Sequence, residues 1–254
     1  MKRYDVVTLF PEMFDAIADS GITGRALDKK LWALHCWNPR DFVSDKYKTI
    51  DDRPFGGGPG MVMKAAPIAD AIKAAKARQA TFAVQPKVIY LSPQARPMKD
   101  ADVRRLSAEA GIVFLCGRYE GIDERVIQAE VDEEISIGDY VLSGGELAAM
   151  VVIDAMLRLL PGVLNDGESS VEDSYSPARD GLLDHPHYTR PDVWNDDVIP
   201  SVLMSGNHQE IARWRRRMAI ERTWLRRPDL LNEAALTKEE LQWLYEIKMK
   251  SSVL

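Results

Sequence analysis

The chain has 254 residues, of which 46% are hydrophobic and 28% are charged, as is usual for a globular protein in water. This length allows one large domain, or a large and a small one, with a substantial core. The formal net charge of −6 excludes a chain that is basic as a whole, so any nucleic-acid surface must be local. The apolar stretch after Arg3 is short and is interrupted by Asp5, so no signal peptide is predicted. The apolar run Leu147 to Leu160 is too short to cross a bilayer. We expect a cytoplasmic protein with no membrane partner.

The two cysteines, Cys36 and Cys116, lie in apolar, strand-like segments. Buried thiols are expected there, and a disulfide is the less favoured alternative. The histidines form no H-E-x-x-H pattern and no paired cysteines accompany them, so a structural zinc site is not expected.

The first elements in chain order are a buried strand from Val6 to Phe10 and a helix that starts at Pro11. A second strand is expected from Leu31 to Trp37. The glycine-rich segment Asp45 to Gly60 follows. It contains no G-x-x-x-x-G-K-[ST] motif, and Met61 stands where a dinucleotide fingerprint needs its third glycine. A mobile loop that closes over a ligand and a plain surface turn are equally favoured readings.

Helices and strands then alternate, and the strands are continuous apolar runs. This pattern predicts an α/β domain with a parallel sheet covered on both faces. The expected elements are a helix Pro67 to Gln79, a strand Lys87 to Leu91, a helix Pro97 to Ala110, a strand Ile112 to Cys116, a helix Ile122 to Gln128, and a strand Glu134 to Ile137.

Three of these strands end in loops that begin near Ser92, Gly117 and Ile137. In parallel α/β sheets, ligands bind outside the carboxyl ends of the strands, so three such loops predict a binding site. Within the second loop, Glu120 is the best acidic candidate.

A long apolar helix is expected from Leu147 to Leu160, with Asp154 and Arg158 as its charges. Apolar side chains on every face predict burial in a core or against a second subunit. Gly144 and Gly145 precede this helix and allow a ligand to approach the backbone closely; a simple tight turn is the alternative.

The character of the chain changes after Gly162. Residues 165–180 are polar and acidic, which is typical of a mobile interdomain linker. From Trp194 onward the sequence predicts helices. The segment Gly206 to Pro228 is rich in arginine, a pattern that fits a phosphate backbone, although a merely solvated basic helix is also compatible. Its arginines are Arg213, Arg215, Arg216, Arg217, Arg222, Arg226 and Arg227.

Taken together, the motifs resemble the bacterial tRNA (guanine-N1)-methyltransferase family over nearly the whole chain. They are LSPQ from Leu91, CGRYEGIDERV from Cys116, SIGDYVLSGGE from Ser136, EDS from Glu172, HPHYTRP from His185, SGNH from Ser205 and RTWLRRP from Arg222. One position departs from the family pattern, because Ala148 stands where proline is expected.

This resemblance implies a SPOUT-type α/β domain over residues 1–164 with a parallel sheet and a trefoil knot in its C-terminal part. It further implies a flexible linker over residues 165–180 and a small all-helical domain over residues 181–254 that binds tRNA. The resemblance also implies an obligate homodimer with both active sites at the subunit interface. The implied reaction is methyl transfer from S-adenosyl-L-methionine to N1 of guanosine 37 of tRNA, next to the anticodon.

By the same resemblance, Asp173 is the general base and Arg158 is the cation beside guanine O6. From the residues alone, an i,i+4 ion pair with Asp154 is favoured for Arg158, and a turn or N-cap role for Asp173. The resemblance also implies the residues that contact the cofactor: Tyr90, Leu91, Ser92, Pro93, Gly117, Tyr119, Glu120, Ser136, Ile137, Gly138, Asp139, Tyr140, Val141, Leu142, Gly144 and Gly145. Magnesium use is implied too, although no carboxylate cage is visible in the sequence.

Two other functions compete with this hypothesis. A non-catalytic RNA-binding dimer would bind tRNA without turnover, and the presence of both Asp173 and Arg158 counts against it. A related knotted enzyme would methylate rRNA or a ribose hydroxyl, which the position of the methyl group in the product would reveal.

Overall fold

The computed structural model describes residues 1–164, 172–231 and 236–251. The chain divides into two compact units, Met1–Asn165 and Asp166–Leu254, and each is described by itself. Within the described ranges, no helix is both long enough and apolar enough to cross a membrane.

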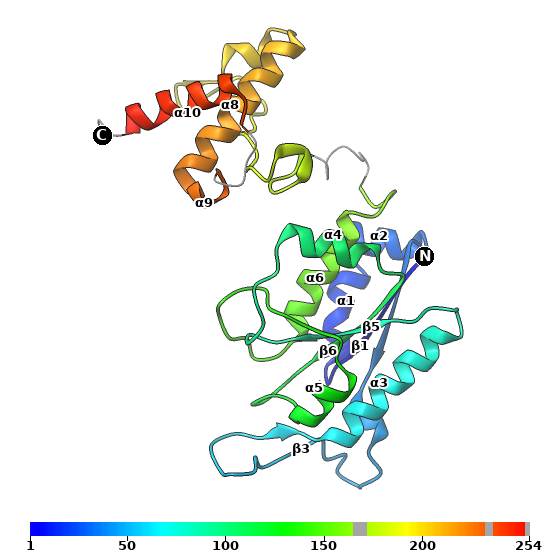
Figure 1. The fold of residues 1–254 in the computed structure, drawn as a ribbon. Helices are drawn as coiled ribbons and strands as arrows, with labels where there is room; N and C mark the ends of the chain where they lie inside the picture. Colours follow the sequence, from blue (N-terminus) through cyan, green and yellow to red (C-terminus); the bar gives the residue numbers. More distant parts are fainter. Residues whose placement is uncertain (165–171, 232–235, 252–254) are drawn as a thin grey trace. The chain divides into compact units, whose positions relative to one another are not determined.

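The first unit is built on a five-stranded sheet in which every neighbouring pair is parallel, in the order β2-β1-β6-β5-β7 (Figure 1). Strand β6 lies at the centre and all of its residues are buried, as expected for a strand covered on both faces. The strands are β1 (Lys2–Val7), β2 (Trp32–Trp37), β5 (Lys87–Leu91), β6 (Gly111–Cys116) and β7 (Glu133–Ile135). The predicted α/β class with a parallel sheet is confirmed.

Helices cover both faces of this sheet (Figure 1). On one face Tyr4 and Phe114 pack against α2 (Gly21–Asp28), α4 (Asp100–Ala108) and α6 (Glu146–Arg158). On the other face lie α3 (Ala65–Ala80) and α5 (Glu124–Glu130), which pack against the remaining strand side chains. The sheet therefore has two apolar cores, one on each side.

Several boundaries differ from the sequence prediction. Strand β1 ends at Val7 rather than Phe10, because Thr8 turns its hydroxyl toward Glu146 and Pro11 begins the short 3₁₀ helix η1 (Pro11–Phe14). The helix predicted from Pro11 is therefore a 3₁₀ turn, followed by one turn of α-helix, α1 (Asp15–Ala18). Strand β7 ends at Ile135, because the next residues form a turn. We call the loop that begins with this turn the Ser136 loop.

The glycine-rich segment lies between two very short antiparallel strands, β3 (Asp51–Asp52) and β4 (Val62–Met63). The 3₁₀ helix η2 (Pro39–Phe42) precedes it. Gly56, Gly57, Gly58 and Gly60 all have positive φ angles, which glycine adopts without strain.

The second unit has a small core formed by Leu182, Ile220, Trp243, Leu244 and Ile247, together with Leu231. Its helices are α8 (His208–Arg226), α9 (Pro228–Leu231) and α10 (Lys238–Ser251), and its 3₁₀ helices are η3 (Pro177–Arg179) and η4 (Ser201–Met204).

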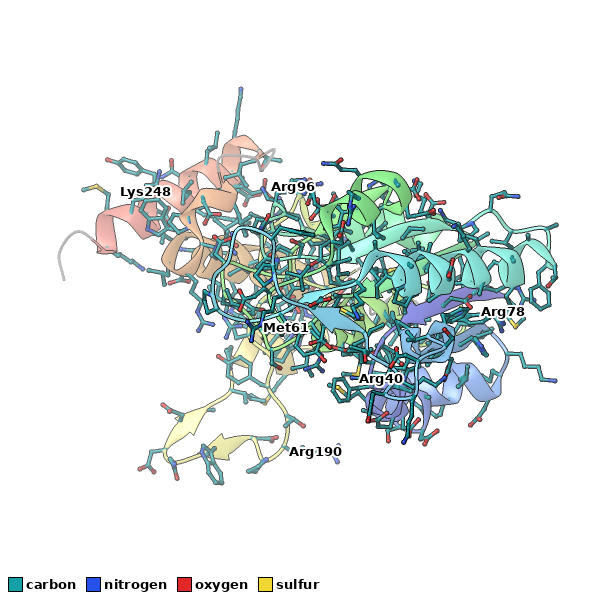
Figure 2. All side chains as sticks on the ribbon, turned by 90° about the horizontal axis from the view of Figure 1, so that it is seen from below. Arg40, Met61, Arg78, Arg96, Arg190 and Lys248 are labelled. Carbon is teal, nitrogen blue, oxygen red and sulfur yellow. The ribbon has the colours of Figure 1, made fainter. Side chains whose placement is uncertain are left out.

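The prediction of an all-helical second domain is wrong in one respect. Strands β8 (Val193–Trp194) and β9 (Asp197–Val198) form an antiparallel hairpin, and all of its residues are exposed (Figure 2). Asn195 and Asp196 make its two-residue turn with positive φ angles, which both residue types tolerate. The Asn-Asp pair was the sequence signal for this turn.

Candidate active site at the carboxyl ends of the strands

A pocket lies at the carboxyl ends of β5, β6 and β7. Because these strands are neighbours in the sheet, the loops that follow them meet at one edge. Backbone hydrogen bonds join the loops: Ser92 N donates to Ile135 O at 3.0 Å, and Gly145 N donates to Gly117 O at 3.0 Å.

Every residue predicted to contact a cofactor lines this pocket, with the exception of Asp139. The shared lining residues are Tyr90, Leu91, Ser92, Pro93, Gly117, Tyr119, Glu120, Ser136, Ile137, Gly138, Tyr140, Val141, Leu142, Gly144 and Gly145. The sequence analysis missed Arg118, Gly121, Ile135, Ser143 and Ala148, which also line the pocket. Four of these five residues, all except Ala148, lie within or next to the sequence motifs that form the pocket loops. Ala148, which replaces the expected proline, is buried in the first turn of α6.

The Gly117 loop is shaped by its contact with Tyr90. A Cβ atom on Gly117 would lie 2.8 Å from the Tyr90 hydroxyl oxygen, so only glycine fits there. Burial, followed by the charge of Glu134, raises the pKa of Tyr90 to about 12. Tyr90 therefore keeps its proton at neutral pH and acts as a wall of the pocket.

The Ser136 loop is held by its own side chains. Ser136 Oγ donates to Gly138 O at 2.9 Å and accepts from Gly138 N at 3.1 Å. A Cβ atom on Gly138 would lie 2.4 Å from the Tyr140 ring, so the ring position requires glycine. Tyr140 and Val141 are exposed along this wall, where a ligand can cover them.

The glycine-rich segment ends beside the pocket. Glu120 N donates to Met61 O at 2.9 Å, and a Cβ atom on Gly60 would lie 2.3 Å from Glu120 Oε1. Phe55, inside the segment, has a fully exposed side chain. Both readings of the segment, a cover for a ligand and a surface turn, remain predictions.

The two predicted catalytic residues lie in different units. Arg158 is half-buried in the last turn of α6, in the first unit. Asp173 is half-buried in the second unit, where its carbonyl oxygen accepts from Ser176 N at 3.3 Å. Their catalytic roles remain predictions. Residues 165–171 of the predicted linker lie outside the described residues.

Most of the predicted basic patch is neutralised by α10 and its surroundings. Arg216 pairs with Glu240 and Asp180, and Arg217 pairs with Glu246 at 3.1 Å. Arg213 pairs with Glu239, and Arg227 pairs with Asp229. Three arginines have no ion pair with any described residue: Arg215, Arg222 and Arg226. Their spacing of seven and four residues places them on one face of α8, which we call the arginine stripe.

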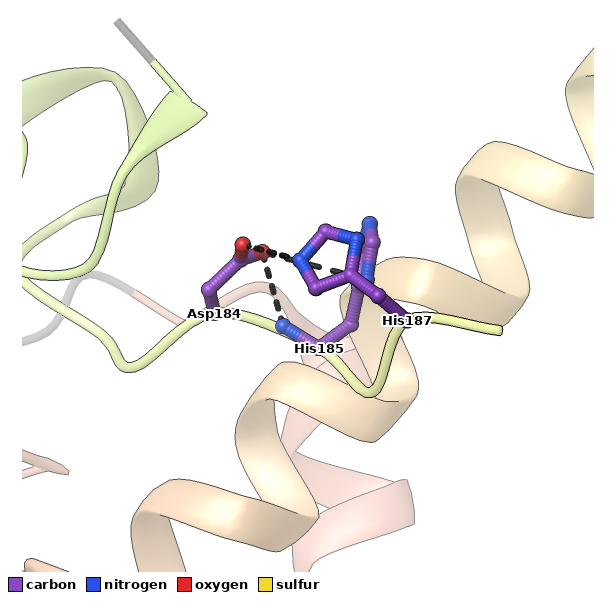
Figure 3. A group of neighbouring side chains, drawn as sticks. All are labelled: Asp184, His185 and His187. Carbon is purple, nitrogen blue, oxygen red and sulfur yellow. Dashed lines mark hydrogen bonds and ion pairs between the residues drawn. The ribbon is translucent and has the colours of Figure 1, made fainter. Parts of the chain in front are cut away.

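Asp184, His185 and His187 form a cluster in the second unit (Figure 3). Asp184 Oδ2 is 2.7 Å from His187 Nε2, and Asp184 Oδ1 accepts from His185 N at 2.7 Å. The possible ligand atoms lie within 4.8 Å of one another, whereas zinc ligands stand about 3.3 Å apart given bonds near 2 Å. The guanidinium of Arg179 also lies 3.1 Å from Asp184 Oδ1, so this carboxylate already has a cationic partner. The cluster is therefore better described as a set of hydrogen-bonded side chains than as a metal site. Its D-H-P-H run resembles neither the H-E-x-x-H pattern nor a paired-cysteine site, so the sequence gives no signal for this cluster.

Both cysteines are free thiols, Cys116 buried and Cys36 half-buried, as expected from the sequence. Burial raises the pKa of the Cys36 thiol to about 12, with further contributions from Asp15 and Asp5. Neither thiol is a nucleophile at neutral pH.

Comparison with known proteins identifies the family. The family model for tRNA (guanine-1)-methyltransferase TrmD matches residues 1–233. A tRNA (guanine-N(1)-)-methyltransferase of Pasteurella multocida is 57% identical over 247 residues, covering 97% of this chain and 98% of that protein. The proteins of the same name from Chromobacterium violaceum and Edwardsiella ictaluri are 56% and 58% identical, covering 99% and 96% of this chain and 98% and 93% of their own lengths. The chain therefore belongs to the TrmD family of tRNA (guanine-1)-methyltransferases.

Proposed function

We propose that the protein transfers a methyl group from S-adenosyl-L-methionine to N1 of guanosine 37 in tRNA, and that it does so in the cytoplasm. The observation that carries the proposal is the pocket at the strand ends, in a chain whose relatives are named for guanine-N1 methylation. The fold brings together residues from three loops that are far apart in the sequence.

The lining of the pocket fits this cofactor. Five of its twenty lining residues are glycines, so an extended polar ligand can approach the main chain closely at those positions. Leu91, Ile137 and Leu142 supply apolar surface for a base, and Glu120 supplies a carboxylate for a cationic ligand. When bound, S-adenosylmethionine supplies an electrophilic methyl group.

The reacting nitrogen sets the chemistry that the protein must provide. Guanine N1 carries a proton at neutral pH, so its lone pair is not available for attack. A base must remove this proton, and a cation must stabilise the negative charge that builds on O6. We assign the first role to Asp173 and the second to Arg158. A single methyl displacement needs no covalent enzyme intermediate.

The active form would be a homodimer with a trefoil knot in the C-terminal part of the first unit. Leu147 and Val151 support the dimer, because they stand one turn apart on α6 and are about half exposed. Exposed apolar side chains on an otherwise buried helix are typical of an interface. In such a dimer the two copies would together form each active site.

The second unit would hold the tRNA. The arginine stripe of α8 offers positive charge that no described carboxylate neutralises, and phosphates are its natural partners. Asp173, also in the second unit, would be brought to the N1 atom of the bound guanosine.

Magnesium use stays a prediction, and the described part of the chain offers no cage of three close oxygen ligands. The one group there with three close ligand atoms contains two imidazoles, whereas magnesium prefers oxygen ligands. The proton transfer and charge stabilisation assigned above need only Asp173 and Arg158.

Methyl transfer to tRNA transcripts tests the proposal directly. With labelled S-adenosylmethionine, a transcript with guanosine at position 37 should accept about one methyl group, and a transcript with adenosine there should accept none. Binding of both transcripts without transfer to either would support the non-catalytic RNA-binding alternative and contradict the proposal.

A further inference from the structure

A buried carboxylate lies directly behind the pocket. Glu146, the first residue of α6, is fully buried. Its Oε1 accepts a hydrogen bond from the Thr8 hydroxyl at 2.8 Å, and its Oε2 lies 2.9 Å from Arg118 Nε. That second contact lacks hydrogen-bond geometry, so charge attraction holds the two groups together. Burying such a charge is costly unless it is paired, and a buried ion pair adds little net stability over apolar side chains of similar volume.

The guanidinium of Arg118 is engaged by the protein on every side. Arg118 Nη1 donates to Ser143 O at 3.2 Å, and Nη2 contacts Met13 Sδ at 3.6 Å. Its Cζ atom lies 4.3 Å from the centre of the Phe10 ring. Although Arg118 lines the pocket, its charge is therefore directed into the protein rather than toward a ligand.

These contacts tie two walls of the pocket to each other. Arg118 belongs to the Gly117 loop, whereas Ser143 and Glu146 belong to the segment that follows the Ser136 loop. Arg118 also forms an isolated β-bridge with Gly144. Thr8, at the end of β1, holds the carboxylate from a third direction.

The close contacts around Arg118 explain why two glycines, Gly144 and Gly145, precede α6. A Cβ atom on Gly144 would lie 2.3 Å from Arg118 Nε, and one on Gly145 would lie 2.8 Å from the Cys116 Cα atom. The two glycines therefore permit the close approach of Arg118 and of the end of β6, as well as access for a ligand.

We propose that Thr8, Glu146 and Arg118 act as positioning residues that hold the Gly117 and Ser136 loops in the shape that binds the cofactor. None of the three is a catalytic residue. The inference rests on the proposed function only for the identity of the ligand, S-adenosylmethionine or its product S-adenosylhomocysteine.

The experiment compares single and double substitutions in the full chain. Arg118→Met and Glu146→Gln each leave one buried charge unpaired, so both should lower the melting temperature and weaken S-adenosylhomocysteine binding at least tenfold in calorimetry. The double variant carries no buried charge, so its melting temperature should recover. Its cofactor affinity should not recover, because the link between the loops is missing. In turnover, its KM for the cofactor should rise at least tenfold while kcat falls less than threefold.

Thr8 provides a milder version of the same test. Thr8→Ser keeps the hydroxyl and should bind S-adenosylhomocysteine like the wild type, whereas Thr8→Val should weaken binding several-fold. Arg125→Met is the matched control, because Arg125 pairs with Asp123 on the surface just beyond the same loop. This control should bind normally.

Two outcomes would overturn the proposal. One is a double variant with recovered stability and wild-type affinity, which would make the ion pair purely structural. The other is unchanged amide hydrogen exchange of residues 117–121 and 136–145 in the ligand-free double variant, where we expect exchange at least ten times faster. The exchange measurement needs no ligand, so it tests the link between the two loops even if the wild type does not bind the cofactor. Failure of the wild type to bind the cofactor would contradict the proposed function and not this inference.

Discussion

In the proposed mechanism Asp173 would have the most demanding task of any single residue, because it would take a proton that guanine N1 does not release readily. A general base typically contributes 10²- to 10⁴-fold to a rate. Asp173→Asn keeps the shape of the side chain and removes its basicity, so kcat should fall at least about 100-fold. Binding of S-adenosylhomocysteine should stay within about twofold, because no cofactor contact is lost.

Asp196→Asn is the control for this substitution. Asp196 lies at the exposed turn of the β8–β9 hairpin with a positive φ angle that asparagine also adopts. Its turnover should match that of the wild type. Unchanged turnover in Asp173→Asn would show that another group removes the proton.

His185 gives the second unit a predictable response to acid. Burial is the main cause that lowers the pKa of His185 below its ordinary value of 6.5. Between the folded value and 6.5 the unfolded chain binds the proton and the folded chain does not, so the free energy of unfolding falls as the pH drops below about 6.5. The melting temperature of the wild type should therefore fall as the pH is lowered below about 6.5.

His185→Phe should remove this part of the acid response, because phenylalanine can pack against Trp214 without titrating. Tryptophan fluorescence during heating, at a series of pH values, follows unfolding, and four of the six tryptophans lie in the second unit. His208→Gln, at the exposed start of α8, should leave the acid response intact. If His185→Phe and the wild type lose stability in parallel, the acid response originates elsewhere.

Sequence reasoning located the pocket because its residues follow apolar strands in motifs of glycine, serine and tyrosine. It missed the role of Arg118 for a physical reason. The meaning of that arginine depends on Glu146 and Thr8, which lie far away in the sequence and meet it only when β1, β6 and α6 pack together. A side chain whose partner comes from another element cannot be assigned from its own motif.

At the scale of elements, α6 carries a face that the first unit leaves uncovered. Val151 and Leu147 are about half exposed on it, while Val152 and Ile153 beside them are fully buried. Val151→Asp should convert the proposed homodimer to a monomer, because a carboxylate on an apolar interface would have no partner there. Light scattering after gel filtration measures the mass, and methyl transfer should be lost with the dimer.

Leu241→Asp on α10 is the corresponding control, because Leu241 is similarly exposed in the second unit. It should leave the mass unchanged. A Val151→Asp variant that stays dimeric would place the interface on another surface.

The arginine stripe of α8 predicts the salt dependence of tRNA binding. Replacing Arg215, Arg222 or Arg226 with glutamine should weaken binding to all tRNAs alike, and each substitution should reduce the salt slope by about 1. Arg213→Gln should change the slope much less, because Glu239 already neutralises Arg213. Fluorescence titrations across a range of salt concentrations measure both quantities. Equal slopes for Arg213→Gln and Arg222→Gln would contradict this assignment.

The helix α8 also illustrates where sequence reasoning falls short. The sequence between Gly206 and Pro228 shows a large excess of arginine, which indicates a basic patch. The neutralising glutamates Glu239, Glu240 and Glu246 all come from α10, which lies outside that segment. The hairpin β8–β9 was overlooked for a different reason: two-residue strands are too short to show a periodicity.

At the scale of the whole molecule, the two proposed catalytic groups belong to different units. Arg158 belongs to the unit that contains the cofactor pocket, and Asp173 belongs to the unit that carries the arginine stripe. Catalysis would therefore require tRNA, cofactor and both units to act together.

Mapping the methylated nucleoside tests the central claim most directly. After incubation of the protein with S-adenosylmethionine and an unmodified tRNA that has guanosine at position 37, the tRNA is digested and analysed by mass spectrometry. The proposed function predicts one new modified nucleoside, 1-methylguanosine, in the fragment that contains position 37. A methyl group on a ribose, on another base or at another position, or no methyl group at all, would contradict it.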